Sequence, residues 1–188
     1  MKKIVILASG SGTNAENIAR YFSGSESVKI VSILSNKKDS YVLTRAANLG
    51  IPHAVFSKQE MENGTLAKTI KSMEPDLIVL SGFLLKIPAS MVDAFPRKIV
   101  NIHPALLPKF GGKGMYGDRV HEAVVASGET ESGITIHYID ENYDQGSTIF
   151  QAKCSVLPTD TPHDVAAKVH ALEYQWFPKI IEKVLIED

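Results

Sequence analysis

The chain has 188 residues, a length that fits one globular domain able to fold without disulfides or metal ions. It carries 20 lysine and arginine residues against 21 aspartate and glutamate residues, so no overall basic field exists to hold a nucleic acid or an anionic membrane. The single cysteine, Cys154, excludes an internal disulfide, and no apolar stretch approaches membrane-spanning length. We therefore expect one domain over residues 1–188, in the cytoplasm, that binds small molecules as a monomer or homodimer.

Strand-like and helix-like segments alternate over the first hundred residues. Short β-branched runs predict strands, and most are continuously hydrophobic, as strands buried on both faces are; they span residues 4–8, 28–34, 53–56, 76–82 and 98–103. Helix-like segments lie between them, at residues 13–22, 41–50, 58–73 and 88–95. This alternation predicts an α/β fold with a Rossmann-like, doubly wound, mostly parallel sheet.

The pattern changes after residue 130. Residues 133–140 and 147–156 are strand-like and are separated only by the turn-rich ENYDQG, which predicts a C-terminal antiparallel hairpin added to the sheet. A long terminal helix is expected to begin with Thr161 as N-cap and Asp164 three residues later. The glycine-rich residues 111–117 favour a mobile loop.

The loop after the first strand, ASGSGTN, predicts an anion site. Glycines let the backbone approach an anion, and a helix starting near Thr13 and Asn14 points its free N–H groups at that place. The alternative is a plain turn in which Thr13 or Asn14 only caps the helix. The stretch from Gly10 to Ala15 also matches a dinucleotide fingerprint. The second strand, however, ends in Asn36, Lys37 and Lys38 instead of an acid, so an NADP-binding protein is an alternative and an NAD-binding one is disfavoured.

The segment after the fourth strand, SGFLLKIPAS, carries four large apolar residues and one lysine. In an open parallel sheet, ligands bind beyond the carboxyl ends of the strands. The segment therefore forms either the wall of an apolar pocket or a stretch of core that turns toward Pro88.

The fifth strand ends in NIHP. Residues two apart in an extended backbone face the same side, so Asn101 and His103 can converge on one atom, and Pro104 keeps His103 extended. An amide N–H and a protonated imidazole aimed at one oxygen form an oxyanion site for acyl transfer, although a histidine that merely caps a strand fits the same pattern. His137, inside a strand-like run, is expected to be a strand-face residue and not a catalyst.

A protonated histidine near neutral pH needs a carboxylate beside it to raise its pKa. Three acids follow the sixth strand: Asp140, Glu141 and Asp144. The residues alone do not choose among them, and all three also suit a turn.

Glu173 interrupts the apolar stripe of the last helix, four residues after Val169 and four before Phe177. A buried carboxylate is costly unless it is paired, so it either binds a partner such as a ligand hydroxyl or reaches solvent at the edge of the stripe.

Together these motifs are recognisable. The loop GSGTN, the block NIHPALLP and the turn DENYDQG closely resemble the phosphoribosylglycinamide formyltransferase family, folate-dependent enzymes of purine synthesis, over essentially the whole chain. The resemblance implies transfer of a formyl group from 10-formyltetrahydrofolate to the amine of glycinamide ribonucleotide. It requires no metal and no covalent enzyme intermediate.

The resemblance also assigns roles to residues. Asn101 and His103 polarise the formyl oxygen, and Asp144 pairs with His103. The ribonucleotide phosphate is held by Gly12, Thr13 and Asn14, and its ribose hydroxyls by Glu173. Leu84, Leu85, Lys86 and Ile87 line the pterin pocket, and Lys58 stands where many relatives carry an arginine near the folate tail. The variable segment 111–121 receives no role, and a formyltetrahydrofolate hydrolase is an alternative activity.

Overall fold

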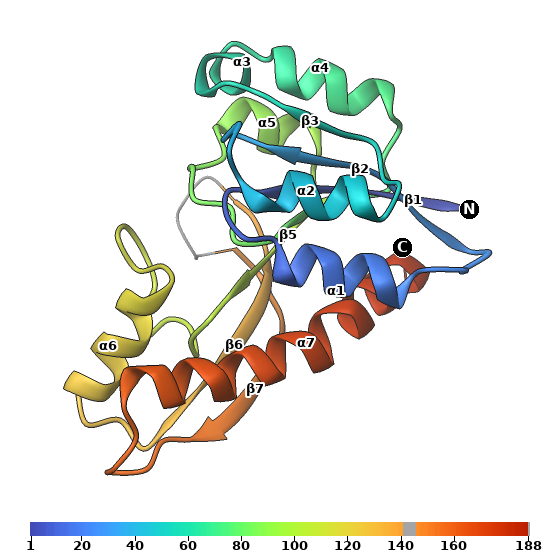
Figure 1. Cartoon of the computed structure of the whole chain (residues 1–188). Coiled ribbons are helices and arrows are strands. Elements are labelled where there is room, and N and C mark those ends of the chain that lie inside the picture. Colours follow the sequence, from blue (N-terminus) through green and yellow to red (C-terminus); the bar gives the residue numbers. More distant parts are fainter. Residues whose placement is uncertain (141–145, 188) are drawn as a thin grey trace.

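The computed structural model describes residues 1–140 and 146–187. Its seven strands form one sheet in the order β3-β2-β1-β4-β5-β6-β7 (Figure 1). The strands are β1 (Lys2–Ala8), β2 (Val28–Ser35), β3 (His53–Val55), β4 (Leu77–Leu80), β5 (Ile99–His103), β6 (Glu131–Tyr138) and β7 (Thr148–Ser155). The first five pair in parallel, whereas β6 and β7 are antiparallel. The predicted mostly parallel sheet with a C-terminal antiparallel hairpin is confirmed.

Helices cover both faces of the sheet (Figure 1). They are α1 (Thr13–Tyr21), α2 (Tyr41–Asn48), α3 (Lys58–Glu62), α4 (Thr65–Ser72), α5 (Ala89–Ala94), α6 (Asp118–Ala126) and α7 (Pro162–Glu187). Strand β1 shows why two layers form: Ile4 and Ile6 pack with α1, α2 and α7, while Val5 and Leu7 pack with α3, α4 and α5. Alternate residues of a strand face opposite sides, so a continuously apolar strand needs cover on both.

Two expected elements differ in detail. The predicted helix over residues 58–73 is in fact two helices, because Gly64 adopts a left-handed φ of 83° and ends the first helix. Asn63 helps to start the second, since its side-chain oxygen accepts a hydrogen bond from the Thr65 N–H at 3.0 Å. Strand β3 is exposed at all three residues, as suits the edge of the sheet.

Helix α6 was not predicted. It begins at Asp118, inside the stretch 111–121 that was treated as a loop. Three glycines with positive φ precede it: Gly112, Gly114 and Gly117. Glycines at this density are typical of a loop, so the sequence does not indicate where the helix begins. Only Val120 and Val124, buried four residues apart, carry a helical signal.

The terminal helix α7 is confirmed. Its first turn is closed by a reciprocal pair: the Thr161 N–H donates to the Asp164 carboxylate at 2.8 Å, and the Asp164 N–H donates to Thr161 Oγ1 at 3.2 Å. Its buried stripe includes Val165, Val169 and Phe177. No helix in the described part of the chain is long and apolar enough to cross a membrane.

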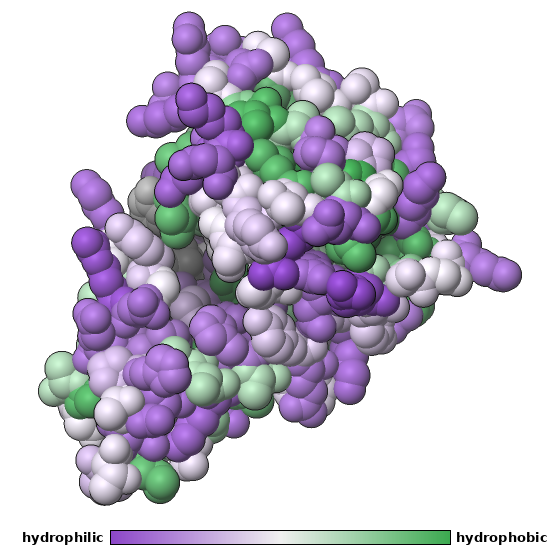
Figure 2. Space-filling model, viewed as in Figure 1, coloured by the Kyte–Doolittle hydropathy of each residue, from purple (hydrophilic) through white to green (hydrophobic). Residues whose placement is uncertain are grey.

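The connections turn in opposite directions on the two sides of the β1–β4 pair, because β2 and β3 lie beyond β1 and β5 lies beyond β4. Crevices form at such a switch point, beyond the carboxyl ends of the strands. In Figure 2 the surface is hollowed between the main body of the molecule and the lobe that carries α6.

Candidate active site

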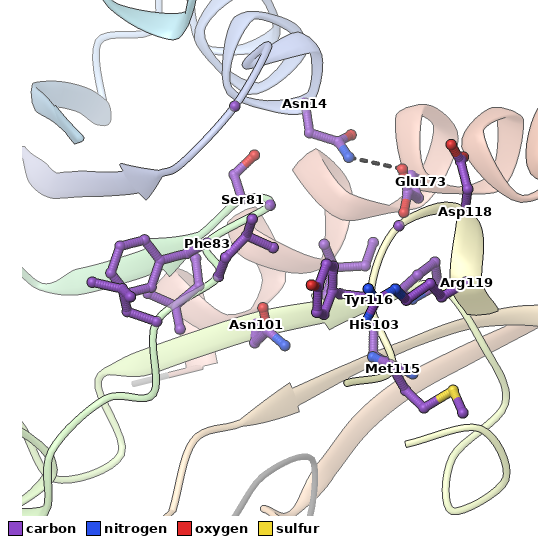
Figure 3. Close-up of a pocket in the computed structure, with 18 of the residues that line it drawn as sticks. Asn14, Ser81, Phe83, Asn101, His103, Met115, Tyr116, Asp118, Arg119 and Glu173 are labelled. Atoms are coloured by element: carbon purple, nitrogen blue, oxygen red, sulfur yellow. Dashed lines mark hydrogen bonds between the residues drawn. The ribbon is translucent and has the colours of Figure 1, made fainter. Parts of the chain in front are cut away.

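A cleft of about 610 Å³ lies at this switch point. Four stretches of chain contribute most of its lining: residues 10–14, 80–87, 101–104 and 112–119. They follow β1, span the carboxyl ends of β4 and β5, or precede and begin α6, and α7 adds His170 and Glu173. The volume suits a substrate-sized ligand. The loops singled out in the sequence therefore meet in one place (Figure 3).

Asn101 is half-buried in β5, and its amide is oriented by a histidine on the neighbouring strand. Asn101 Nδ2 lies 3.2 Å from His137 Nε2, and His137 Nδ1 lies 3.0 Å from the Tyr138 carbonyl oxygen. A carbonyl oxygen only accepts, so Nδ1 of His137 carries the proton and Nε2 accepts from the amide. One N–H of Asn101 is thus fixed, and its second N–H is available to the cleft. His137 is fully buried in β6, as expected of a strand-face residue.

His103 lines the cleft from the same strand and is only 4% exposed. Its Nε2 donates to the Phe110 carbonyl oxygen at 2.7 Å. Phe110 presents that carbonyl from a left-handed conformation, with φ of 54°. The end of β5 is itself tied down by Thr135, whose hydroxyl donates to the Ala105 carbonyl at 2.7 Å and accepts from the Leu107 N–H at 3.0 Å.

Of the three acids that the sequence offered as partners of His103, the structure describes only one. Asp140 is described and lines the cleft. Glu141 and Asp144 lie outside the described residues, so the pairing of Asp144 with His103 stays a prediction.

The loop after β1 packs tightly against α2. Gly12 has a φ of 76°, and a Cβ built on it would lie 2.3 Å from Val42 Cγ2. Gly12, not Thr13 or Asn14, occupies the N-cap position of α1, and no side chain caps the helix. The alternative in which Thr13 or Asn14 serves as the cap is therefore wrong. The first residues of α1, whose N–H groups have no acceptor within the helix, line this end of the cleft.

Glu173 is 5% exposed, so of the two alternatives left open by the sequence the structure agrees with the buried, paired carboxylate and not with one that reaches solvent. Its Oε2 accepts from Asn14 Nδ2 at 2.8 Å (Figure 3) and from His170 Nδ1 at 2.9 Å. Both bonds end on one oxygen, which leaves Oε1 for a further donor. The hydrogen bond to Glu173 raises the pKa of His170, against the opposing effect of burial.

The segment after β4 is both wall and core. Leu84 is 44% exposed and lines the cleft, whereas Ile87 is 4% exposed and packs in the core between the sheet and α3 to α5. Leu85 and Lys86 also line the cleft. Lys58 does not belong to this lining; it is exposed on α3 and pairs with Glu62 at 3.4 Å.

The sequence did not single out His121, His170 or Asp118 as site residues, yet all three line the cleft. His170 lies three residues before Glu173 on a helix, so helical spacing could have linked them. His121 and Asp118 required knowledge of α6. Among the described residues, no group of three or more histidine, cysteine, aspartate or glutamate side chains is arranged to hold a metal ion.

Comparison with known proteins agrees with this architecture. Residues 2–181 match the model of the formyl transferase family. The chain is 39% identical to phosphoribosylglycinamide formyltransferase, chloroplastic, of Arabidopsis thaliana, covering 99% of this chain and 66% of that protein. It is 37% identical to phosphoribosylglycinamide formyltransferase of Haemophilus influenzae, covering 97% of this chain and 86% of that one. The chain thus spans somewhat less than two thirds of the length of its plant relatives, 66% for Arabidopsis and 62% for Vigna unguiculata.

Solved structures are also similar. Phosphoribosylglycinamide formyltransferase from Anaplasma phagocytophilum superposes with a TM-score of 0.90 at 31% identity, over 99% of this chain and 88% of that one. The enzyme from Coxiella burnetii gives 0.86 at 38% identity, over 95% and 84%. With a family match over nearly all its residues, and a fold and cleft that its own sequence explains, the chain belongs to the formyl transferase family.

Proposed function

We propose that this protein transfers the formyl group of 10-formyltetrahydrofolate to the amine of glycinamide ribonucleotide, a reaction of purine synthesis. The observation that carries the proposal is the position of Asn101 and His103 on one edge of a cleft, between an anion-binding loop and an apolar wall. The names of the relatives from Arabidopsis and Haemophilus support the choice of amine substrate.

The reaction begins when the neutral amine of the ribonucleotide attacks the formyl carbon. The carbonyl electron pair moves to oxygen, and the tetrahedral oxyanion is stabilised by the free N–H of Asn101 and by protonated His103. One proton leaves the former amine and one reaches the folate nitrogen N10. The C–N10 bond then breaks, giving the formamide and tetrahydrofolate. Both catalytic side chains act as donors, and neither forms a bond to the substrate.

His103 must be released to take part through Nε2. That nitrogen now donates to the Phe110 carbonyl at 2.7 Å, so binding of the formyl donor exchanges one acceptor for another. Asp144 is proposed as the carboxylate that pairs with His103, on the basis of the family resemblance.

The ribonucleotide is proposed to lie between α1 and α7. Backbone N–H groups of Gly12, Thr13 and Asn14 hold its phosphate at the positive end of the α1 dipole. Glu173 accepts from ribose hydroxyls through Oε1, the oxygen that the Asn14 and His170 bonds leave for a further donor.

The folate is proposed to occupy the opposite end of the cleft. Residues 84–87 supply an apolar wall for the pterin, and exposed Leu84 is the side chain that gains most from being covered. Lys58 lies outside the cleft lining and is proposed only as a solvent-side contact for the folate tail.

An NADP-binding function is disfavoured by the packing beside the first loop. Val42 fills the space against Gly12, and its N–H donates to the Gly10 carbonyl at 3.2 Å. Lys37 and Lys38 are exposed and are not among the described residues that line the cleft.

We also propose that residues 1–188 act as one domain, supported by a family match that spans residues 2–181 and by a single sheet. A cytoplasmic location, small-molecule partners only, and a monomer or homodimer remain predictions that accompany this function.

The test follows tetrahydrofolate formation by absorbance, with 10-formyltetrahydrofolate present and glycinamide ribonucleotide either present or omitted. Turnover that requires the ribonucleotide supports a transferase, whereas equal turnover without it identifies a hydrolase. Asn101→Ala and His103→Ala should each lower kcat by roughly 10²–10³, the cost of one oxyanion donor, while binding the ribonucleotide normally. His163→Ala, an exposed histidine at the start of α7, is the matched control. Near-normal kcat in either cleft variant would refute the assignment.

A further inference from the structure

His121 is a buried histidine whose hydrogen-bonding capacity the fold does not use. It is 2% exposed, lines the cleft from α6, and its Nδ1 is sealed from solvent without a hydrogen-bond partner among the described residues. A buried polar group without a partner destabilises the folded protein. Because Nδ1 is sealed inside the fold, Nε2 is the ring nitrogen of this cleft-lining side chain that can meet a ligand.

The surroundings of His121 determine its charge and tautomer. Burial lowers its pKa, and the nearby charge of His170 lowers it further, while Glu173 and Asp118 act in the opposite direction. Burial and the charge of His170 thus both favour the neutral form of His121. Because burying an unpaired N–H costs more than burying an unpaired lone pair, we expect the proton on Nε2 and the lone pair on Nδ1. His121 then offers one N–H donor to the cleft.

The same end of the cleft holds acceptors that lack donors. Asn14 Oδ1 is buried and unpartnered among the described residues, and the two hydrogen bonds to Glu173 both end on Oε2, so its Oε1 can accept from a ligand. Figure 3 shows Asn14, Glu173 and Asp118, one turn before His121 on α6, gathered at this end. The ring of His170, which binds Glu173, lies 6.1 Å from the ring of His121.

These groups fit a vicinal diol and not a phosphate. A phosphate offers only acceptor oxygens and would face the Glu173 carboxylate and the Asn14 carbonyl oxygen. Two adjacent hydroxyls donate to those two acceptors and still accept a hydrogen bond from the imidazole.

We propose that His121 is a specificity-determining residue that donates from Nε2 to a ribose hydroxyl, the same diol that Glu173 and Asn14 accept from. This inference rests on the proposed function for the identity of the sugar. It makes the diol site a three-sided one, built by α1, α6 and α7.

The test combines a protein change with a ligand change. KM and kcat are measured for wild type and His121→Phe with glycinamide ribonucleotide and with its 2′-deoxy and 3′-deoxy analogues. Losing one buried hydrogen bond should raise KM roughly threefold to tenfold, with kcat changed less. One of the two analogues lacks the hydroxyl that the imidazole holds. For His121→Phe, the KM of that analogue should be no higher than the KM of the ribonucleotide, because the variant has already lost this hydrogen bond.

Two controls separate contact from packing. His121→Gln retains a side-chain N–H and should recover part of the affinity, and the exposed His163→Phe should behave as wild type. Calorimetric titration with the ribonucleotide gives the same comparison without turnover. If His121→Phe fails to fold, His121→Leu, which also lacks an N–H, takes its place in the same comparison with the ribonucleotide and its two deoxy analogues.

The outcomes distinguish this inference from the proposed function. Wild type that neither binds nor formylates the ribonucleotide overturns both. If wild type does bind and formylate the ribonucleotide, but removing a hydroxyl raises KM by the same factor in wild type and in the His121 variants, only the role of His121 is overturned.

Discussion

The substitution Gly12→Ala tests the link between the first loop and α2. Gly12 has a φ of 76°, and its new Cβ would lie 2.3 Å from Val42 Cγ2 and 2.8 Å from Val42 Cα. A left-handed non-glycine residue costs about 1–2 kcal/mol, and overpacking adds about 1–3 kcal/mol. The backbone contact prevents relief by a rotamer change of Val42 alone. We expect a loss of roughly 2–5 kcal/mol of the free energy of unfolding.

The assay is urea denaturation followed by circular dichroism, together with thermal melting. For a chain of this length the expected fall in Tm is roughly 5–15 °C. Gly10→Ala is the control in the same loop, because its Cβ meets no atom within 4 Å. We expect that variant to stay within about 0.5 kcal/mol of wild type. Equal stability of the two variants would show that the close approach of Gly12 to Val42 does not exist in the folded protein.

Two further predictions concern the walls of the cleft. Thr135→Val removes the hydroxyl that donates to the Ala105 carbonyl and accepts from the Leu107 N–H. Both backbone groups then lack a partner, so the free energy of unfolding measured by urea denaturation should fall by roughly 2–4 kcal/mol. An unchanged denaturation midpoint would contradict these bonds. His170→Gln tests the ion pair with Glu173, which raises the pKa of His170 in the folded protein. The pair therefore stabilises the folded protein fully below the unfolded pKa of about 6.5, and this stabilisation is lost as pH rises through the folded pKa. The stability difference between wild type and His170→Gln should therefore be larger near about pH 6 than near about pH 9, and a difference that grows with pH would contradict the pairing.

The sequence was sufficient for features that depend on local periodicity. Asn101 and His103 were predicted to share a face because a strand alternates, and both do line one cleft. The switch point followed from the order of strands and helices. Glu173 was found as an interruption in an apolar stripe, since a carboxylate there is costly without a partner.

The sequence was insufficient where partners are remote. The amide that pairs with Glu173 belongs to Asn14, 159 residues away along the chain. His121 reaches the cleft only because α6 packs against α7, and α6 itself was obscured by three glycines with positive φ. Neither residue has a local signature that distinguishes it from an ordinary surface or core side chain.

In the loop after β1, a tertiary hydrogen bond of Asn14 takes precedence over the local helix cap that its residue type favours. Asn14 is of a residue type that often caps helices, and capping would satisfy one backbone N–H for about 1 kcal/mol. A hydrogen bond to a buried carboxylate is about twice as strong as one between neutral groups, so the side chain turns to Glu173 at 2.8 Å. The N-cap position then falls to Gly12, which lies too close to Val42 to carry any side chain. The N–H groups of the first turn are left without a side-chain cap, and this is the condition under which a helix N-terminus can bind an anion.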